Sequence, residues 1–309
     1  MNKIITITLN PAIDKTVTVK GLIPEKKLRC APAIYEPGGG GVNVSRVLQR
    51  LGSESTAVFL AGGHTGSFYT ELVARQEIAY KAIPIAGNTR ENFTALDEST
   101  NLQYRFVMES PQVEIHEWQQ CLDILRNEDC GFVVVSGSVP KNMDTAFFDE
   151  LAAITKKKEI KLIADASGEP LQHLLKRGVY LAKPNLGELS VLCGKEELLP
   201  HEVIDAARTV LKDNKCGMLA VSMGAAGAML ITANEVYQAP APAVKRRSTV
   251  GAGDSMVAGM VWALSNGLPL QQVIRYGVAA GTAATMNHGT ELCRRQDVER
   301  IYQELNKMA

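Results

Sequence analysis

Short apolar runs that alternate with helical patterns are the feature that most restricts how this chain can fold. Residues 4–9, 132–135, 161–164 and 179–182 are dominated by apolar side chains, and each run ends in polar or turn-forming residues. Apolar residues recur at helical spacing in the segment 44–51, which follows the first run. Continuous apolar strands separated by helices predict an α/β fold, with a mostly parallel sheet covered by helices on both faces.

Two departures from this alternation are visible. Residues 218–221 and 228–231 are apolar and close together in the chain, which predicts an antiparallel hairpin. The segments at about 15–36 and 89–109 are polar and prone to form strands, so we expect them to form a small β lid beside the main sheet. No linker-like tract divides the chain, and we expect residues 1–309 to form one domain.

Polar residues follow the apolar runs. They are Asn10, Ser136, Ser138, Asp165, Lys183 and Asn185. The carboxyl ends of parallel strands meet at one edge of a sheet, and ligands bind at that edge. Each residue alone could be ordinary turn chemistry, but the set predicts a ligand site.

Charge and cysteine content limit the partners. The chain has 33 Lys and Arg against 33 Asp and Glu, a formal charge of zero, so we expect neither a nucleic-acid nor a membrane partner. Its six cysteines show no C-x-x-C spacing, which is typical of reduced thiols in a cytoplasmic protein. No apolar run approaches the roughly 18 residues that a membrane span requires.

The strongest chemical signal is the segment 248–255, Ser-Thr-Val-Gly-Ala-Gly-Asp-Ser, which runs into a predicted helix. Glycines before a helix let backbone N–H groups approach an anion, and Asp254 could take a proton from a hydroxyl held beside that anion. Phosphoryl transfer to an alcohol needs both functions. The alternative is that Asp254 only caps the helix. No Walker A sequence occurs in the chain.

A second glycine-rich segment, 37–43, precedes the helical pattern at 44–51 and ends in Asn43. Its four consecutive glycines suit a close backbone approach to a ligand, and the Asn43 amide suits sugar hydroxyls. A flexible loop is the alternative.

Three further residues offer chemistry at the same predicted site. Asn185 and Glu188 are three apart, so their oxygens could hold Mg²⁺, or they could form a capping box at the start of a helix. Arg90, in the predicted lid, could grip a substrate phosphate, or it could be a solvated surface residue.

Taken together, these segments resemble the PfkB (ribokinase-like) family of sugar kinases over essentially the whole chain. Residues 249–254 are similar to its T-x-G-A-G-D signature, residues 38–45 to its N-terminal glycine signature, and Asn185-x-x-Glu188 to its N-x-x-E magnesium motif. The resemblance implies a three-layer α/β/α fold with a small β lid, and phosphorylation of a hexose phosphate by ATP.

One position bears on the acceptor. Members of the family that act on fructose 1-phosphate usually carry Lys at the position of Gly40, so the resemblance favours fructose 6-phosphate, converted to fructose 1,6-bisphosphate. Glu291, where members that act on fructose 6-phosphate carry Arg, bears instead on the monovalent-cation loop that the resemblance implies. Tagatose 6-phosphate and fructose 1-phosphate remain alternative acceptors, and a sensor that binds sugar phosphate or nucleotide without catalysis is an alternative of another class.

The resemblance also implies a role for each matching residue. Asp254 would be the general base, beside an anion hole built by Gly251, Ala252 and Gly253. The sugar phosphate would contact Asp14, Lys27, Gly38, Gly39, Asn43, Arg90 and Ser138. ATP would contact Lys183, Asn185, Ser222, Gly224, Gly227 and Thr282. Glu188 would organise Mg²⁺.

A loop for a monovalent cation, K⁺, is implied at Ser248, Val250, Ala284, Asn287 and Gly289. The family resemblance further implies a homodimer.

Overall fold

A large sheet and a small sheet organise the computed structural model, which describes residues 3–287, 289 and 291–307. The strands of the large sheet are, in spatial order, β13 (Val236–Ala239), β12 (Ala228–Ile231), β11 (Cys216–Ser222), β10 (Val179–Ala182), β9 (Lys161–Asp165), β8 (Phe132–Ser136), β1 (Ile4–Thr8), β4 (Ser55–Ala61) and β5 (Ala79–Pro84). Neighbours are parallel except at β12, which is antiparallel to β11 and β13. The predicted parallel sheet and hairpin are both confirmed.

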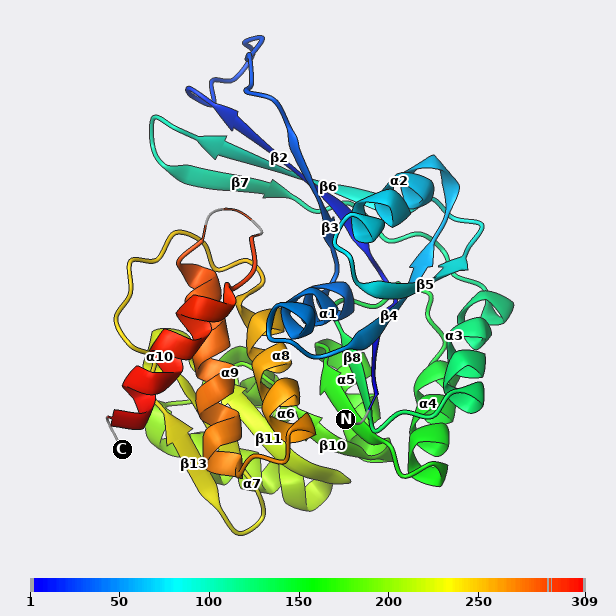
Figure 1. The fold of residues 1–309 in the computed structure, drawn as a ribbon, viewed down its shortest axis with the longest axis vertical. Helices are drawn as coiled ribbons and strands as arrows, with labels where there is room; N and C mark the ends of the chain where they lie inside the picture. Colours follow the sequence, from blue (N-terminus) through cyan, green and yellow to red (C-terminus); the bar gives the residue numbers. More distant parts are fainter. Residues whose placement is uncertain (1–2, 288, 290, 308–309) are drawn as a thin grey trace.

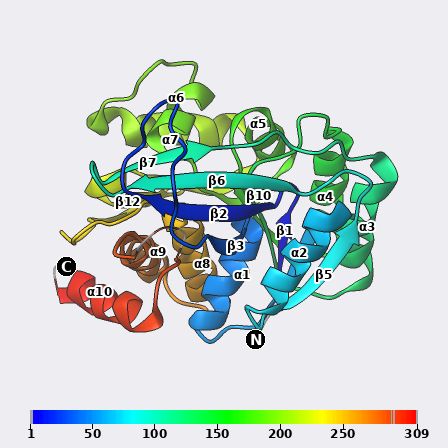
Figure 2. The same cartoon turned by 90° about the horizontal axis from the view of Figure 1, so that it is seen from above.

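Helices cover both faces of this sheet, which gives three layers (Figure 2). One face carries α1 (Gly40–Arg50), α2 (Gly63–Ala74), α8 (Ala252–Ser265), α9 (Leu270–Thr285) and α10 (Arg295–Lys307). The other carries α3 (Ile115–Asn127), α4 (Ala146–Lys157), α5 (Gly168–Arg177), α6 (Leu186–Leu192) and α7 (Val203–Asp213). Short 3₁₀ turns lie at Pro200–Glu202 and Gly224–Ala226.

Two cores result because successive strand residues point to opposite faces. In β8, Val134 packs into the core beneath α1, α8 and α9, whereas Val133 and Val135 pack beneath α3 and α4. A strand buried on both sides must be apolar throughout, which explains the unbroken apolar runs.

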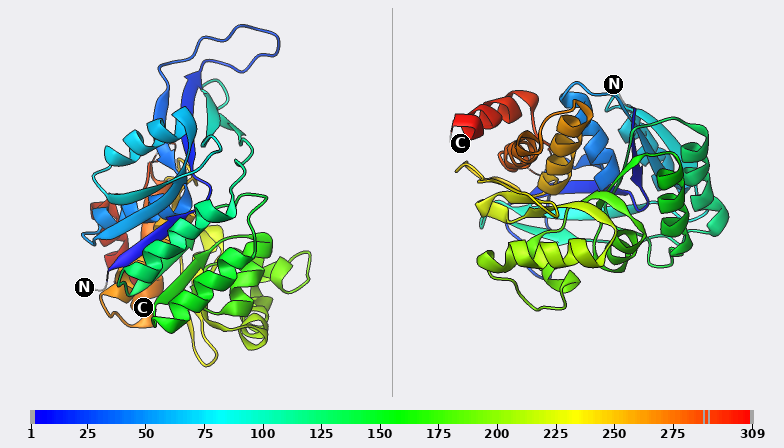
Figure 3. Two further views of the ribbon diagram at one scale, coloured as in Figure 1. Left: turned by 90° about the vertical axis from the view of Figure 1, so that its right-hand side faces the viewer. Right: turned by 90° about the horizontal axis from the view of Figure 1, so that it is seen from below.

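The small sheet contains β3 (Ile34–Gly38), β2 (Ala12–Val19), β6 (Arg90–Asp97) and β7 (Leu102–Phe106), in that order. β2 pairs with β6 in parallel, and the other two pairs are antiparallel. It projects from the body of the molecule, as the side view shows (Figure 1; Figure 3, left). Residues 20–33 form the loop at its far end rather than continuous strand, with one isolated bridge between Val19 and Cys30.

Two findings concern the chain as a whole. None of the helices in the described ranges is both long and apolar enough to cross a lipid bilayer. All six cysteines lie in the described part of the chain, and all six are free thiols, as predicted.

Candidate active site

The polar residues that follow the apolar strands do meet at one edge of the large sheet. Ser136, at the end of β8, donates its hydroxyl hydrogen bond to Asp165 Oδ2 at the end of β9, 3.1 Å away. Lys183 follows β10, and its ammonium lies 2.9 Å from Asp165 Oδ1. Asn10 Nδ2 donates to Ser138 Oγ at 3.1 Å. These contacts tie together the ends of four neighbouring strands.

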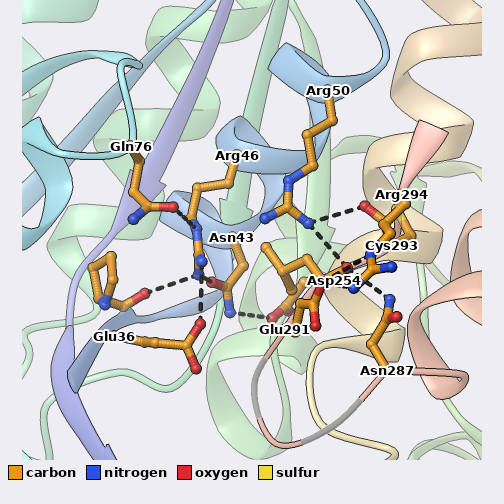
Figure 4. A network of polar contacts seen from close by, with 12 residues as sticks. Glu36, Asn43, Arg46, Arg50, Gln76, Asp254, Asn287, Glu291, Cys293 and Arg294 are labelled. Carbon is orange, nitrogen blue, oxygen red and sulfur yellow. Dashed lines mark hydrogen bonds and ion pairs between the residues drawn. The ribbon is translucent and has the colours of Figure 1, made fainter. Parts of the chain in front are cut away.

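Two helices begin at this edge, and their first turns bring Asn43 and Asp254 into contact. Asp254 is in the first turn of α8, and its Oδ2 accepts a hydrogen bond from Asn43 Nδ2 of α1 at 2.8 Å (Figure 4). The N-cap position of α8 is Gly251, and no side chain caps this helix. The interpretation of Asp254 as a helix cap is therefore wrong, and its carboxylate is available for other chemistry.

The pKa of Asp254 is raised to about 6, with burial as the largest cause. The nearby Asp165 and Asp14 carboxylates also raise it, whereas the Asn43 hydrogen bond and the Lys183 ammonium oppose the shift. A carboxylate with a pKa near 6 is still ionised at neutral pH but is a stronger base than an exposed Asp. This combination suits a general base.

The backbone before Asp254 leaves room for an anion. Gly251 has φ of 71°, in the left-handed region that favours glycine, and this turn starts α8. The first bond of the helical ladder joins Ser255 N–H to Gly251 C=O, so the Gly253 and Asp254 N–H groups precede it. A Cβ added at Gly253 would approach only Lys183, at 3.6 Å from Nζ. That space belongs to no described side chain.

Lys183 is the cation nearest this space. It is only 6% exposed, yet it carries its charge beside Asp165. Burial opposes the charge of the ammonium, but the carboxylates of Asp165, Glu188 and Asp254 together raise the pKa of Lys183 above its usual value. A buried, paired ammonium facing the helix start is well placed to attract phosphate oxygens.

The four glycines at 38–41, which end β3 and begin α1, are required by packing against protein atoms. A Cβ at Gly38 would lie 2.6 Å from Asp14 Cγ, one at Gly40 2.7 Å from Gly137 N, and one at Gly41 2.6 Å from Ile7 O. The flexible-loop interpretation is wrong, because this segment is tightly held. The glycines let the start of α1 press against β1 and β8, and this close packing brings Asn43 to Asp254.

Arg90, at the start of β6, spans both sheets. Its Nη2 donates to Ser138 Oγ at 3.0 Å and to Asn10 C=O at 3.2 Å, and its Nη1 donates to Met108 C=O at 3.2 Å. Arg90 Nε and Asn10 Oδ1 are buried and have no partner among the described residues. Buried polar atoms without partners are rare in folded proteins, so a ligand contact would account for both. Arg90 is not simply a solvated surface residue.

Asp14 lies on the inner side of the small sheet. Asn92 Nδ2 donates to its Oδ1 at 3.0 Å, and burial is the main cause that raises its pKa. A small cavity of about 20 Å³ is lined by Asp14, Asn92 and Arg105 of the small sheet and by Val250 and Gly289 of the body. The small sheet and the glycine turn before α8 therefore share one cavity.

Asn185 and Glu188 form the capping box at the start of α6. Glu188 N–H donates to Asn185 Oδ1 at 2.9 Å, and Asn185 N–H donates to Glu188 Oε2 at 2.8 Å. The capping interpretation is confirmed. Asn185 also pairs with Ser222 through an isolated bridge, which joins two of the predicted ATP contacts.

The other predicted nucleotide and sugar contacts lie on several elements. Gly224 and Gly227 flank the 3₁₀ turn between β11 and β12, both with positive φ, and Thr282 is buried in α9. Lys27 is exposed in the loop 20–33, at the end of the small sheet farthest from the body (Figure 1). Within this chain, Lys27 is therefore not brought to the cluster around Asp254.

The predicted cation loop is a compact backbone turn. Ser248 Oγ donates to Gly289 C=O at 2.7 Å, and Asn287 Nδ2 donates to Leu292 C=O at 3.0 Å. The Glu291 carboxylate pairs with Arg294, at 2.8 Å from Nη2 (Figure 4).

The sequence placed Asp165 and Asn10 at the predicted ligand edge without an individual role, and it did not single out Asn92 or Arg46. Asp165 and Asn10 stood out as polar residues after apolar runs, but their partners come from distant parts of the chain. Arg46 has no signal beyond its place in a helix.

Comparison with known proteins supports the resemblance. Residues 4–297 match the pfkB family carbohydrate kinase model. The chain is 40% identical over 303 residues to the ATP-dependent 6-phosphofructokinase isozyme 2 of Mycobacterium tuberculosis H37Rv, covering 97% of this chain and 89% of that protein. The crystal structure of Escherichia coli phosphofructokinase-2 with potassium matches 99% of this chain and all of that one, with a TM-score of 0.95 and 38% identity. The same enzyme with fructose-6-phosphate matches with a TM-score of 0.93, 36% identity and the same coverage.

Proposed function

Because this chain belongs to the pfkB family of carbohydrate kinases, we propose that it transfers the γ-phosphoryl group of ATP to fructose 6-phosphate, making fructose 1,6-bisphosphate. The observation that carries this proposal is Asp254, an ionisable carboxylate with a pKa of about 6 at the glycine-rich start of a helix. A solved relative that binds fructose-6-phosphate supports the choice of sugar.

Asp254 would accept the proton of the attacking sugar hydroxyl. Asn43 donates to one carboxylate oxygen, Oδ2, and leaves Oδ1 for the substrate. As the hydroxyl oxygen attacks the γ-phosphorus, the bond from that phosphorus to the bridging oxygen of ATP breaks and ADP leaves. The N–H groups at the start of α8 would stabilise the charge that develops on the transferred phosphoryl oxygens.

The sugar phosphate would lie between the two sheets. Arg90 already holds Ser138 and Asn10, and its unpartnered Nε supports a role in binding the phosphate. Asp14 and Asn92, which face the shared cavity, would bind sugar hydroxyls, with Gly38, Gly39 and Asn43 forming the wall beside them. In this arrangement the small sheet is the lid of the site.

ATP would occupy the edge marked by Lys183, Asn185 and Ser222. Lys183 supplies the local positive charge that a chain of zero net charge needs in order to hold two anionic substrates. Gly224, Gly227 and Thr282 would complete this side.

The residues fit Mg²⁺ that arrives with ATP. No group of three or more His, Cys, Asp or Glu side chains in the described ranges could hold a metal alone, and Mg²⁺ in kinases is bound largely through substrate phosphates. Glu188, which commits Oε2 to the helix cap, would contribute Oε1 directly or through water. When bound, Mg²⁺ neutralises phosphate charge.

We further propose that a monovalent cation binds at Ser248, Val250, Ala284, Asn287 and Gly289, where backbone carbonyl oxygens would be its main ligands. Glu291 does not disturb this, since its carboxylate pairs with Arg294. A relative solved with potassium supports the assignment of K⁺.

A homodimer formed through the small sheet is the assembly we propose. Leu102 and Tyr104 alternate along β7 and are 56% and 42% exposed, so one face of this edge strand is apolar and uncovered. Gln103, Arg105 and Phe106 line the cavity instead. A second copy covering the apolar face would bury it and protect the edge of the sheet.

A panel of acceptors tests the proposed function. ADP release is measured with ATP and Mg²⁺ on fructose 6-phosphate, tagatose 6-phosphate and fructose 1-phosphate. We expect the highest kcat/KM on fructose 6-phosphate. A higher kcat/KM on tagatose 6-phosphate or fructose 1-phosphate would show that this sugar, and not fructose 6-phosphate, is the preferred acceptor. Tight ATP binding without turnover on any sugar would contradict it in favour of a sensor.

A further inference from the structure

A chain of hydrogen bonds runs from the small sheet to Asp254 through α1 (Figure 4). Arg46 Nη1 donates to Asn43 Oδ1 at 3.1 Å, and Asn43 Nδ2 donates to Asp254 Oδ2 at 2.8 Å. Arg46 is 4% exposed and Asn43 8%, so water has little access to replace these bonds.

The donors and acceptors of these side chains fix the direction of the two hydrogen bonds. An asparagine amide can turn over, which exchanges its oxygen and its NH₂ group. A guanidinium has only donors, so Arg46 satisfies Asn43 only when Oδ1 faces Arg46. The NH₂ group must then face Asp254 and donate to it.

Arg46 is itself held from three sides. Its Nε donates to Gln76 Oε1 at 3.0 Å, its Nη1 donates to Pro37 C=O at 3.4 Å, and its Nη2 pairs with Glu36 Oε1 at 3.4 Å. Glu36 and Pro37 belong to β3 of the small sheet. The rigid planar fork of an arginine can meet all these acceptors at once, whereas a single ammonium cannot.

We propose that Arg46 is a positioning residue for phosphoryl transfer, which locks the Asn43 amide in the orientation that keeps Asp254 an ionised hydrogen-bond acceptor. The inference rests on the proposed function, in which Asp254 is the base. Without Arg46 the amide can turn over, and its oxygen would then face the carboxylate. Only a protonated Asp254 could bond to that oxygen, so the pKa of Asp254 would rise above about 6.

The other charges around the pair stay in place when Arg46 is changed. Asp165 from β9 and Asp14 from β2 raise the pKa of Asp254, and Lys183, which follows β10, lowers it. Glu36, Arg50 and Tyr69 act on Arg46. Arg50 is changed only in the control variant, and the other groups are unaltered in all the variants below.

The first test is the dependence of kcat/KM on pH for the wild type, Arg46→Met, Asn43→Ala and the double variant. The wild-type value should fall below about pH 6 as Asp254 is protonated. Arg46→Met should move this acid limb up by about one pH unit, because the loss of one hydrogen bond to a charged group changes its pKa by about that much. The double variant should move it no further than Asn43→Ala alone. An unmoved limb in Arg46→Met, or shifts that add in the double variant, would overturn the proposal.

Arg50→Met is the matched control. Arg50 lies one turn further along α1, and its Nη1 donates to the carbonyls of Leu292 and Cys293 at 2.9 and 3.0 Å. Its loss should lower stability without moving the acid limb. An equal movement in Arg50→Met would show a general effect of losing an arginine from α1, and would overturn the role of Arg46. If Arg46→Met does not fold, Arg46→Lys takes its place, with a smaller movement in the same direction.

A second test needs no turnover, so it separates this inference from the proposed function. For the wild type and for Arg46→Met, the unfolding midpoint is compared with that of the same protein carrying Asp254→Asn, from pH 4 to 8. The folded pKa of Asp254 lies above its unfolded value, so the carboxyl's contribution to stability is lost as pH rises towards about 6. In Arg46→Met this loss should continue about one pH unit higher. Identical curves would overturn the inference even if the protein is an active kinase.

Discussion

At the scale of single residues, Asp254 is both the proposed general base and a charge that destabilises the folded protein. A buried carboxylate near Asp165 and Asp14 is held ionised mainly by Asn43 and Lys183. Such a group is a useful base because its charge is unfavourable in the folded state. The unfavourable charge of Asp254 should also affect the stability of the folded protein.

We expect Asp254→Asn to fold and to lose at least about 10² in kcat, the low end for removing a general base. Because the wild-type carboxyl binds its proton more tightly when folded, its stability contribution is present below pH 4 and lost towards pH 6. The variant should therefore be more stable than the wild type above pH 6, by up to about 3 kcal/mol. Steady-state rates and chemical unfolding measure the two effects. Near-wild-type kcat would reject Asp254 as the base.

Arg90→Ala should raise KM for the sugar phosphate more than KM for ATP. The guanidinium joins Ser138 and Asn10 at the sugar side and has no contact with Lys183 or Asn185 among the described residues. Initial rates with each substrate varied in turn give both constants. Arg75→Ala is the control, because Arg75 is exposed and pairs only weakly, at 3.9 Å from Glu71. Equal changes in both KM values would contradict a phosphate-binding role.

At the scale of helices and strands, sequence reasoning works where a rule is local. Apolar runs predicted the parallel strands, Gly224 and Gly227 marked the hairpin, and Asn185 with Glu188 gave the capping box. The requirement for glycine at 38–41 could not be predicted in this way, because it comes from a close approach to Asp14, Ile7 and Gly137, which lie elsewhere in the sequence. For the same reason, neither the Lys183–Asp165 pair nor the Arg46 contacts could be predicted before the strand order was known.

The packing at α1 makes a prediction of its own. Gly40→Ala should lower the free energy of unfolding by about 1–3 kcal/mol, because its Cβ would lie 2.7 Å from Gly137 N. Gly187→Ala, in the first turn of α6, is the matched control, since its Cβ would meet nothing nearer than Asn185 Oδ1 at 3.4 Å. Alanine there should leave stability unchanged or raise it. Urea unfolding of both variants measures the difference, and similar losses in the two would show that close packing is not the reason for Gly40.

At the scale of the whole molecule, the small sheet has two different faces. One face lines the cavity shared with the body of the molecule, and the other exposes Leu102 and Tyr104. If the exposed face joins two copies, a charge placed on it should separate them.

Tyr104→Asp should therefore reduce the mass measured by sedimentation from that of a dimer towards that of a monomer. A buried charge without a partner is strongly unfavourable in an apolar interface. Ile115→Asp is the control, because Ile115 is 52% exposed at the start of α3, away from the small sheet. A wild-type protein that is already monomeric would contradict the dimer. An unchanged dimer mass in Tyr104→Asp would place the interface elsewhere on the molecule.

The connections between the two sheets are short. Residues 9–11 alone separate β1 from β2, and Gly39 alone separates β3 from α1. The small sheet therefore cannot tilt away from the body without pulling on Asn10 and on the first turn of α1, which holds Asn43. If the sugar enters between the two sheets, its entry would therefore change the alignment of Asn43 with Asp254. We therefore expect the enzyme to hydrolyse ATP only slowly when no sugar phosphate is bound.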